Sequence, residues 1–559
     1  MLLYPFRWLR WLIGSLLARF GRPPDYVTFL VEDEPPALPD PPVPFWQRPF
    51  SRSRLSMREL GERVEAIGRD TRIKGVILHL RPVPFSMAGL QDLREHIGRL
   101  RGKGKRVIAW APFYTTPTYY LACACDEILL LPTGGVMPLG FASTGMFLSD
   151  ALARVGIKAD FVQVSPYKSA ADVLTRSSMS PELREQVTWL LQSNHDQLVD
   201  GIASGRGMQP DAARKLIDES PYDDAGALAA GAVDAVVTEE QIPARLGTGA
   251  RIGDWDQARR KLPRPAPRLR RGRYVALMRI EGTILDGRSG RPPIRPPVNL
   301  PLIGEARAGD LTVVQLARQV AHDGRAAAAV LYVNSRGGSA TASQSMFAAL
   351  ETIAARKPLV VVMGPVAGSG GYLVSMPGRW VIARPGTLTG SIGVLTGKLV
   401  TAGLWEKLTA TRETVAFGKN VTLESDDHAF TPEERRIVEA HVASIYESFL
   451  KLVAASRHLD RDAVKAIADG RVWTGAQALD RKLIDELGGL DAGIAKARAL
   501  ASLPESARVI EVQPPKRSAP PRTLPTAASL AGYVLDGVRM LNRARALAMM
   551  DVVVDSDLF

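Results

Sequence analysis

The stretch VVMGPVAGSGGYLVSM, from Val361 to Met376, carries the pattern that decides how this chain folds. An apolar, β-branched run from Leu359 to Met363 is typical of a buried strand, and a turn of small residues follows it. Ser369 then stands among glycines, which lets another backbone approach its hydroxyl and lets a peptide N–H face a carbonyl oxygen. The pattern suits a nucleophile, and it equally fits a tight strand-to-helix turn with a serine cap.

A second glycine-rich turn lies upstream of the first. The apolar run from Ala327 to Val333 predicts a strand that leads into NSRGGS, residues Asn334 to Ser339, and a helix-compatible run follows to about Arg356. A glycine pair at this place leaves free N–H groups at a helix N-terminus, where an oxyanion can be held. The two turns therefore predict the two halves of one site.

The chain contains an internal repeat with a period of about 250 residues. The pair Tyr26-Val27 begins a predicted strand and recurs as Tyr274-Val275. Each copy alternates apolar runs of strand length with amphipathic stretches of helix length, such as Gln91 to Leu100 and Ser343 to Ala355. This alternation favours a tandem duplication of an α/β domain built around parallel strands with flanking helices.

The two copies differ where the glycine turns fall. The pair Gly337-Gly338 lies opposite Pro84-Phe85, and Ser369 lies opposite Thr116 or Pro117. Proline has no N–H to donate, and the phenylalanine places a Cβ and a ring where close backbone approach is needed. Only the second copy can therefore hold both the nucleophile and the oxyanion site.

A serine hydroxyl needs a base before it can act as a nucleophile. None of the seven histidines stands in a recognisable motif, so a Ser–Lys pair is favoured over a Ser–His–Asp triad. Two lysines occupy equivalent places in the two copies: Lys168 in VQVSPYKSAADVL and Lys419 in VAFGKNVTL. Either lysine can serve only if burial or nearby positive charge keeps it neutral, and a solvated surface lysine is the alternative for each.

These motifs resemble those of the S49 family of serine proteases in its long, duplicated form. The matching segments follow the family's order: YKSA (Tyr167 to Ala170), NSRGGSATAS (Asn334 to Ser343), AGSGGYLVSMP (Ala367 to Pro377), TLTGSIGV (Thr387 to Val394) and VWTGAQAL (Val472 to Leu479).

The resemblance implies which lysine is the base and which serine orients it. Long members of the family take the catalytic lysine from the first copy, which favours Lys168 and keeps Lys419 as the rival. Ser391 matches a family serine near the lysine amine and would orient that amine by a hydrogen bond.

We expect the N–H groups of Gly338 and Gly370 to hold the oxyanion and Gly337 to permit the turn. Arg336 replaces the proline that usually precedes the glycine pair in the family, which leaves the rigidity of this turn open.

The resemblance also implies tandem Clp/crotonase-like domains, a bowl-shaped homotetramer and a Ser–Lys endopeptidase that degrades cleaved signal peptides and other apolar, unfolded peptides. No P-loop or zinc pattern is found, so neither a cofactor nor a metal is expected. Two other functions fit the fold: a crotonase-like enzyme that polarises acyl-CoA thioesters, and a catalytically silent membrane scaffold.

The net charge of +13 favours an anionic partner. No zinc spacing, recognition-helix pattern or aromatic-interleaved basic motif accompanies the charge, so nucleic acid is not expected. Basic residues concentrate in the first 22 residues and in the Pro-rich stretch from Arg259 to Arg273. An anionic membrane surface is therefore the favoured partner.

The N-terminal segment MLLYPFRWLRWLIGSLLARFGR has its longest uncharged run from Trp11 to Ala18, too short to cross a hydrocarbon core. We expect an interfacial amphipathic helix with Trp8 and Trp11 at headgroup level; an export signal and a surface helix are the alternatives. The family usually begins with a transmembrane anchor. We expect association with the bacterial inner membrane and leave its face open.

Five segments are predicted along the chain. They are a basic membrane-contacting segment (1–24), a first repeat that supplies the lysine (25–258), a Pro/Arg linker (259–273), a second repeat that supplies the serine (274–512), and a Pro-rich spacer with a helix or tail (513–559), helical from Ala527 to Met550.

Overall fold

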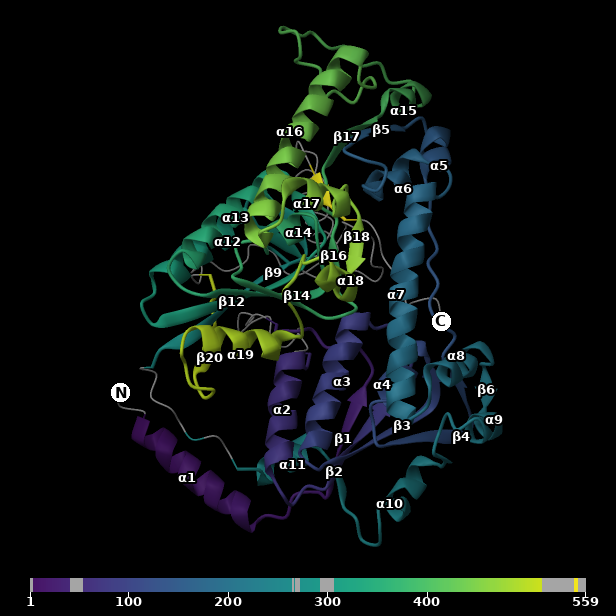
Figure 1. The fold of residues 1–559 in the computed structure, drawn as a ribbon, viewed down its shortest axis with the longest axis vertical. Coiled ribbons are helices and arrows are strands. Elements are labelled where there is room, and N and C mark those ends of the chain that lie inside the picture. The colour runs from purple at the N-terminus through teal and green to yellow at the C-terminus, as the bar shows by residue number, and fades with distance from the viewer. Residues whose placement is uncertain are drawn as a thin grey trace. The chain divides into compact units, whose positions relative to one another are not determined.

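The computed structural model describes residues 4–40, 54–263, 266, 272–291, 306–514 and 547–550. The chain forms two compact units (Figure 1). The first combines the chain up to Ala142 with Asn194–Arg271, and the second combines Ser143–Ser193 with Gly272–Val554. The units do not follow the limits of the sequence repeats, because Ser143–Ser193 comes from the first repeat and belongs to the second unit.

The first unit contains a sheet whose neighbouring strands β1 to β4 all pair in parallel. The strands are β1 (Tyr26–Val31), β2 (Gly75–Leu80), β3 (Arg106–Thr115), β4 (Glu127–Met137), β6 (Tyr222–Asp223), β7 (Ala235–Val236) and β8 (Ile252–Asp254). Their order is β6-β4-β3-β2-β1-β8, with β7 beside β4.

The helices of the first unit are α1 (Tyr4–Phe20), α2 (Met57–Arg69), α3 (Met87–Gly102), α4 (Thr116–Ala122), α8 (Pro210–Asp218), α9 (Asp224–Ala229), α10 (Ile242–Arg245) and α11 (Trp255–Lys261), with a 3₁₀ turn at Glu239–Gln241. The long helix α7 (Pro181–Arg206) begins in the second unit and ends in the first. The main core of the unit lies between the sheet and the buried faces of α2 and α3.

The second unit contains two sheets. The strands are β5 (Lys158–Gln163), β9 (Tyr274–Glu281), β10 (Thr283–Leu285), β11 (Arg307–Gly309), β12 (Ala326–Ser335), β13 (Gly337–Ser339), β14 (Leu359–Gly368), β15 (Trp380–Ala383), β16 (Leu388–Gly390), β17 (Leu395–Val400), β18 (Val472–Thr474), β19 (Glu486–Leu487), β20 (Arg508–Glu511) and β21 (Leu547–Met549). One sheet has the order β18-β16-β14-β12-β9-β20, with β15 beside β14 and β19 beside β15, and the other has the order β11-β10-β13-β21-β17-β5.

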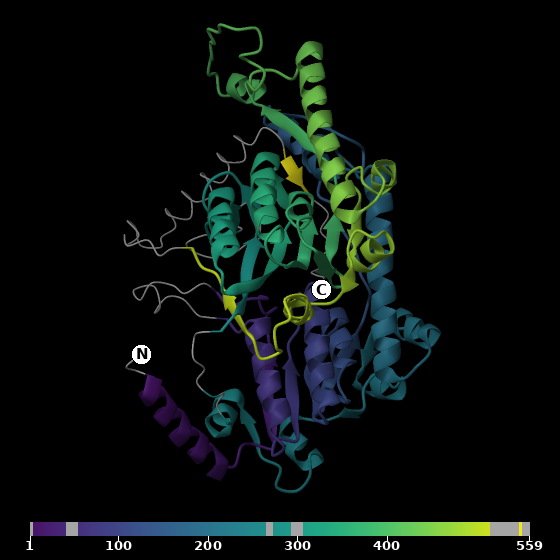
Figure 2. The same ribbon diagram turned by 60° about the vertical axis from the view of Figure 1, so that its left-hand side comes forward.

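The helices of the second unit are α5 (Ser149–Arg154), α6 (Asp172–Thr175), α12 (Asp310–His322), α13 (Ala340–Ala354), α14 (Gly370–Leu373), α15 (Ala402–Lys407), α16 (Pro432–Arg457), α17 (Arg461–Ile467), α18 (Gly475–Asp480) and α19 (Leu490–Leu500), with a 3₁₀ turn at Ser169–Ala171. Helices α12 and α13 cover one face of the larger sheet and α19 the other (Figures 1 and 2). The sheet is covered on both sides, which explains why its central strands read as unbroken apolar runs.

The elements expected around the glycine turns are confirmed. The predicted strand from Leu359 to Met363 is the first half of β14, and the predicted helix from Ser343 to Ala355 lies in α13. Helix α13 begins where it does because the Ser339 hydroxyl accepts the N–H of Ala342. The tandem α/β architecture predicted from the repeat is likewise confirmed.

The C-terminal stretch expected to be helical up to Met550 ends instead in the strand β21. Residues 527–546 of that expected helix lie outside the described residues. Strand β21 pairs antiparallel with both β13 and β17, so backbone groups of neighbouring strands are satisfied there by pairing that a helix could not supply (Figure 2, yellow arrow).

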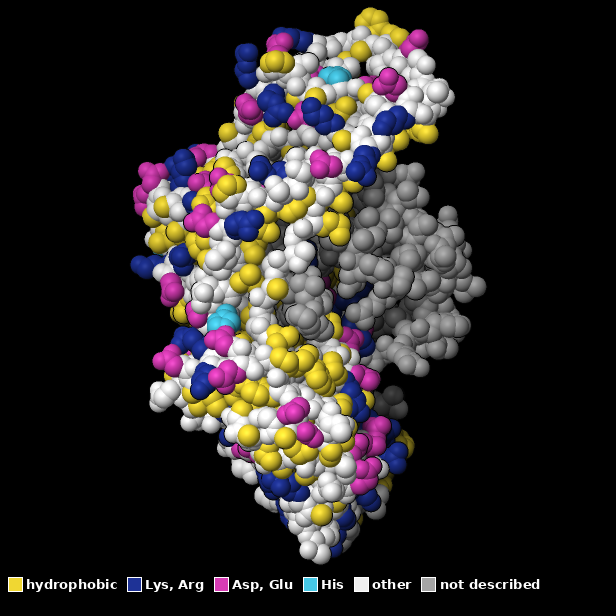
Figure 3. All heavy atoms as spheres, turned by 90° about the vertical axis from the view of Figure 1, so that its right-hand side faces the viewer, with side chains coloured by type: hydrophobic (Ala, Val, Ile, Leu, Met, Phe, Trp, Pro, Cys, Tyr) yellow, Lys and Arg dark blue, Asp and Glu magenta, His cyan; other side chains and the backbone are white. Residues whose placement is uncertain are grey.

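The loop from Leu408 to Thr431 extends beyond α15 at the top of the view in Figure 1. Several of its apolar side chains are exposed, and Figure 3 shows hydrophobic side chains among charged ones at this end of the molecule. The most exposed are Val415 and Phe417. The loop also carries Lys419.

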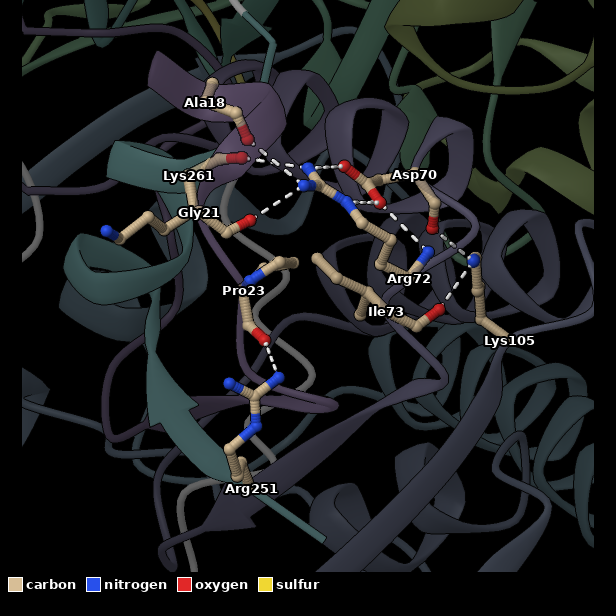
Figure 4. A network of polar contacts seen from close by, with 9 residues as sticks. All are labelled: Ala18, Gly21, Pro23, Asp70, Arg72, Ile73, Lys105, Arg251 and Lys261. Atoms are coloured by element: carbon tan, nitrogen blue, oxygen red, sulfur yellow. Dashed lines mark hydrogen bonds and ion pairs between the residues drawn. The ribbon is translucent and has the colours of Figure 1, made fainter.

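A helix forms at the N-terminus, as expected, and Arg72 holds its end to the first unit (Figure 4). The Arg72 guanidinium donates to the carbonyls of Ala18 (3.1 Å) and Gly21 (2.8 Å) and forms an ion pair with Asp70 (2.7 Å). Along α1 a row of apolar side chains is exposed: Phe6, Leu9, Leu12, Ile13 and Leu16. Among the described residues, no helix combines the length and apolar character needed to cross a bilayer.

Candidate active site

Ser369 joins β14 to α14 and has an unusual backbone. Its φ of +54° and ψ of −113° are values that a residue with a side chain seldom adopts. Its N–H donates to the Gly390 carbonyl and its own carbonyl accepts the Leu373 N–H, each at 2.8 Å. Glycine follows at 371 because a side chain there would collide with the Ser335 carbonyl. Local packing therefore requires both the strained turn and the glycines beside it.

Lys168 follows β5, and its side chain is buried next to Ser369. Its Nζ lies 2.7 Å from the Ser369 Oγ. The same Nζ lies 3.0 Å from both the Oγ and the carbonyl oxygen of Ser391. All three residues belong to the second compact unit of one chain. The structure thus brings together three of the residues singled out from the sequence.

Burial lowers the pKa of Lys168 well below its ordinary value. The cause is desolvation, which disfavours the ammonium ion but not the neutral amine. The partners of the Nζ are a carbonyl oxygen and two hydroxyl oxygens, none of which carries a charge that would restore the ammonium form. The site therefore favours a neutral lysine.

Two glycines enclose Lys168, and sequence reasoning did not find them. A Cβ on Gly470, whose φ is +81°, would lie 2.7 Å from the Lys168 backbone, and one on Gly393 would lie 3.2 Å from its Cδ. The Gly470 N–H donates to the Ile392 carbonyl at 2.8 Å, which fixes this segment next to the turn that carries Ser391. Close approach of these backbones excludes water from the amine. The sequence signal was the position of Gly470 two residues before Val472, where the VWTG motif begins.

Ser391 also has a left-handed backbone, with φ of +50°. Its N–H donates to the Arg471 carbonyl at 2.7 Å, and its side chain is buried. The two serines that contact Lys168 are thus both held in strained conformations by hydrogen bonds to neighbouring segments.

An aromatic stack begins at Tyr167, the residue that precedes Lys168. Tyr167 stacks on Trp189 with ring centroids 6.0 Å apart, and Trp189 stacks on Trp473 at 4.9 Å. The Arg471 guanidinium lies 4.1 Å from the Tyr167 ring centroid. These contacts join α7 to β18 and support the segments that carry Lys168 and Gly470. Sequence reasoning missed the stack, although Tyr167 and Trp473 belong to the YKSA and VWTG motifs.

The residues expected to hold the oxyanion lie in β13 and at the start of α14. Gly337 and Gly338 form β13 with φ values of +97° and +152°, and a Cβ on Gly338 would collide with the Ile284 carbonyl oxygen. Gly370 is the first residue of α14, where N–H groups have no partner within the helix. The Ser335 hydroxyl accepts the Gly337 N–H at 3.1 Å and braces the turn that lacks the usual proline.

Lys419 lies elsewhere in the second unit. Its side chain is 74% exposed, and its Nζ forms an ion pair with Glu433 at 2.6 Å. The hydrogen bond from Lys419 to Glu433 raises the pKa of the lysine, which favours the ammonium ion. The structure therefore places Lys168, and not Lys419, beside Ser369.

Comparison with known proteins shows the family of the chain. The sequence profile of peptidase family S49 matches residues 99–253 and 351–504. The chain is 30% identical over 499 residues to the chloroplastic serine protease SPPA of Arabidopsis thaliana, covering 87% of this chain and 71% of that protein. It is 31% identical over 484 residues to Protease 4 of Salmonella typhi, covering 81% of this chain and 74% of that protein. The chain belongs to peptidase family S49.

Proposed function

We propose that this chain is a serine endopeptidase in which Ser369 is the nucleophile and Lys168 the general base. The observation that carries the proposal is the 2.7 Å separation of the Lys168 Nζ from the Ser369 Oγ in a buried site. A base must lie within hydrogen-bond reach of the proton it removes and must be neutral before it can accept that proton. Burial of Lys168 satisfies the second condition as the distance satisfies the first.

The hydrogen bonds of Lys168 allow one arrangement of protons that suits this role. A neutral amine has two N–H groups and one lone pair. The two N–H groups can donate to the Oγ and the carbonyl oxygen of Ser391, both 3.0 Å away. The lone pair is then left to accept the proton of the Ser369 hydroxyl. Ser391 would thus orient the amine.

The proposed reaction is acyl transfer in two stages. The Ser369 Oγ attacks the scissile carbonyl carbon while its proton passes to Lys168, and the N–H groups of Gly338 and Gly370 hold the oxyanion. The Lys168 ammonium then gives its proton to the leaving amine. A water molecule, deprotonated by the same lysine, attacks the acyl-enzyme and releases the second product. Gly337 permits the turn, and no metal or cofactor takes part in this scheme.

We further propose that the substrates are cleaved signal peptides and other apolar, unfolded peptides. The enzyme would be a homotetramer that binds these substrates at an anionic membrane surface. The exposed apolar row on α1, followed by basic residues in the sequence, supports contact with the surface of the bacterial inner membrane.

The experiment that tests the catalytic pair compares wild type, Lys168→Met and Lys419→Met on an apolar fluorogenic peptide. We expect roughly a thousandfold loss or more in Lys168→Met and no loss in Lys419→Met, because only the first lysine contacts the serine. Size exclusion with light scattering gives the oligomeric state of each variant. Undiminished turnover in Lys168→Met would overturn the proposal.

Membrane contact is tested by sedimentation with vesicles rich in phosphatidylglycerol. We expect wild type to sediment with the vesicles, and the double variant Leu9→Asp, Leu16→Asp to remain in solution while keeping its peptidase activity. If wild type also stays in solution, α1 is a surface helix of the first unit.

A further inference from the structure

Strand β21 fills a slot in the smaller sheet of the second unit. It pairs antiparallel with β13 on one side, in the register Gly337↔Met549, and with β17 on the other, in the register Leu395↔Leu547. In the order of the sheet, β21 alone stands between those two strands. An extended peptide that binds a protein by adding a strand makes this same pattern of backbone contacts.

The strands that border this slot adjoin the proposed catalytic residues in the sequence. Strand β13 contains the glycine pair, and β17 begins shortly after Ser391. Beyond β21, the Met550 N–H donates to the Arg336 carbonyl at 2.8 Å. A Cβ on Gly368 would lie 3.1 Å from the Met550 Cβ, and Gly368 immediately precedes Ser369. The C-terminal segment therefore runs directly alongside the nucleophile.

The Met550 side chain fills an apolar pocket. Only 3% of the residue is exposed. The buried side chains that pack with it are Val187, Leu190, Leu388 and Val472. An unbranched apolar side chain can extend into such a pocket, whereas a carboxylate there would lose its hydration without gaining a partner.

We infer that residues 547–550 are a tethered competitor of the substrate, bound in the peptide slot of the proposed active site. The backbone pairing serves any extended peptide, and the pocket selects an unbranched apolar side chain at the position of Met550. Because a tethered ligand acts at a high effective concentration, weak intrinsic affinity is enough for it to occupy the slot. Substrate enters only when this segment leaves. The inference rests on the proposed function and adds its regulation.

The test replaces Met550 in the full chain by aspartate, which should release the segment. We expect KM for the fluorogenic peptide to fall roughly tenfold with kcat unchanged, since a competitor in the same chain raises only the apparent KM. The control is Met146→Asp, an exposed methionine of the same unit, for which we expect no change. An unchanged KM in Met550→Asp would overturn the inference.

A binding measurement separates this inference from the proposed function. A fluorescent peptide with the sequence of residues 544–552 is titrated into the double variant Ser369→Ala, Met550→Asp and followed by anisotropy. We expect saturable binding, and a loss of at least tenfold in affinity when the peptide carries aspartate at the position of Met550. If peptidase activity is absent from every variant but the peptide binds, the proposed function fails and the slot stands.

If activity depends on Lys168 but the peptide does not bind, the inference alone fails. Intact mass spectrometry adds one further outcome. A wild-type chain cut after Met550, and left whole in Ser369→Ala, would overturn the inhibitory role, because the segment would then be a substrate.

Discussion

The turn after β2 in the first repeat and the turn after β12 in the second share a scaffold but differ in one feature. In the first, Ser86 caps α3, and its N–H and hydroxyl donate to the Glu34 carboxylate at 2.7 and 2.6 Å. In the second, Ser339 caps α13, and its hydroxyl donates to Asp286 at 2.7 Å. Just before the cap, the first copy has the buried ring of Phe85 where the second has its glycine pair.

The other turn differs in the same way. At the start of α4, Thr115 has an ordinary extended backbone, with φ of −90°, and its N–H donates to the Thr118 hydroxyl at 2.8 Å. At the start of α14, Ser369 has a φ of +54°. The same α/β frame therefore accepts either a relaxed cap or a strained turn. Strain is found in the copy whose serine contacts the buried lysine, which suggests that it is retained for chemistry.

The largest expected effect comes from removing the hydroxyl in the strained turn. Ser369→Ala should lower kcat roughly a thousandfold or more, because no other group takes over the nucleophile's role. Thr115→Ala, at the matching cap of α4 in the first copy, should leave kcat unchanged. Peptidase assays on both variants, with far-UV circular dichroism to check folding, decide the comparison. Equal losses in the two would mean that the first copy shares in catalysis.

Adding a Cβ to the glycine pair should have the next largest effect. Gly338→Ala should lower kcat roughly a hundredfold, because the new atom collides with the Ile284 carbonyl and displaces the N–H that we propose holds the oxyanion. Gly98→Ala in α3 is the control, since a Cβ there meets no neighbour; it should stabilise the protein by up to about 1 kcal/mol. Steady-state kinetics should show a loss of kcat for Gly338→Ala only, and thermal unfolding should show added stability for Gly98→Ala only.

A smaller loss of kcat is expected when the Lys168 amine still contacts Ser369 but loses the Ser391 hydroxyl, one of the two groups that orient it. Ser391→Ala should lower kcat about tenfold with little change in KM, since the backbone carbonyl at 391 still holds one N–H of Lys168. Ser375, a buried serine just beyond α14 whose hydroxyl donates to the Gly371 carbonyl, is the control. If Ser375→Ala loses as much activity, the effect of Ser391 is general destabilisation.

The smallest effect concerns stability. Burial lowers the pKa of Lys168 in the folded state, so the unfolded state binds a proton that the folded state lacks at any pH between that pKa and 10.5. Wild-type stability should therefore rise with pH over this range. Lys168→Met should lack this rise and be more stable than wild type by at least about 1 kcal/mol at pH 7, with the gap closing near pH 10.

Denaturant unfolding at several pH values checks the expectation for Lys168→Met, and Lys419→Met provides the matched comparison. Lys419 is exposed and its pKa is raised by Glu433, so its loss should not reproduce the dependence. A stability difference for Lys168→Met that is independent of pH would mean that the lysine is charged in the folded state.

Much of the candidate site could be predicted from the sequence because glycine patterns report backbone geometry directly. Glycine has no Cβ and proline has no N–H. These two facts predict the turns around Gly337 and Ser369 and the loss of both turns in the first copy. The repeat could not choose between Lys168 and Lys419, which occupy equivalent places in it, and only the family resemblance favoured Lys168. Burial decides between them, and burial depends on segments such as Gly470 that lie about 300 residues from Lys168.

The sequence by itself determined the duplicated α/β architecture, the two glycine turns and the copy that holds the serine, because these depend on local periodicity and on the stereochemistry of single residues. Only the tertiary structure decided that Lys168 reaches Ser369, that the Gly470 segment encloses the amine, and that residues 547–549 form a strand between β13 and β17. Those features join segments distant in the chain, and such contacts depend on packing and desolvation in the folded state, which no local pattern encodes.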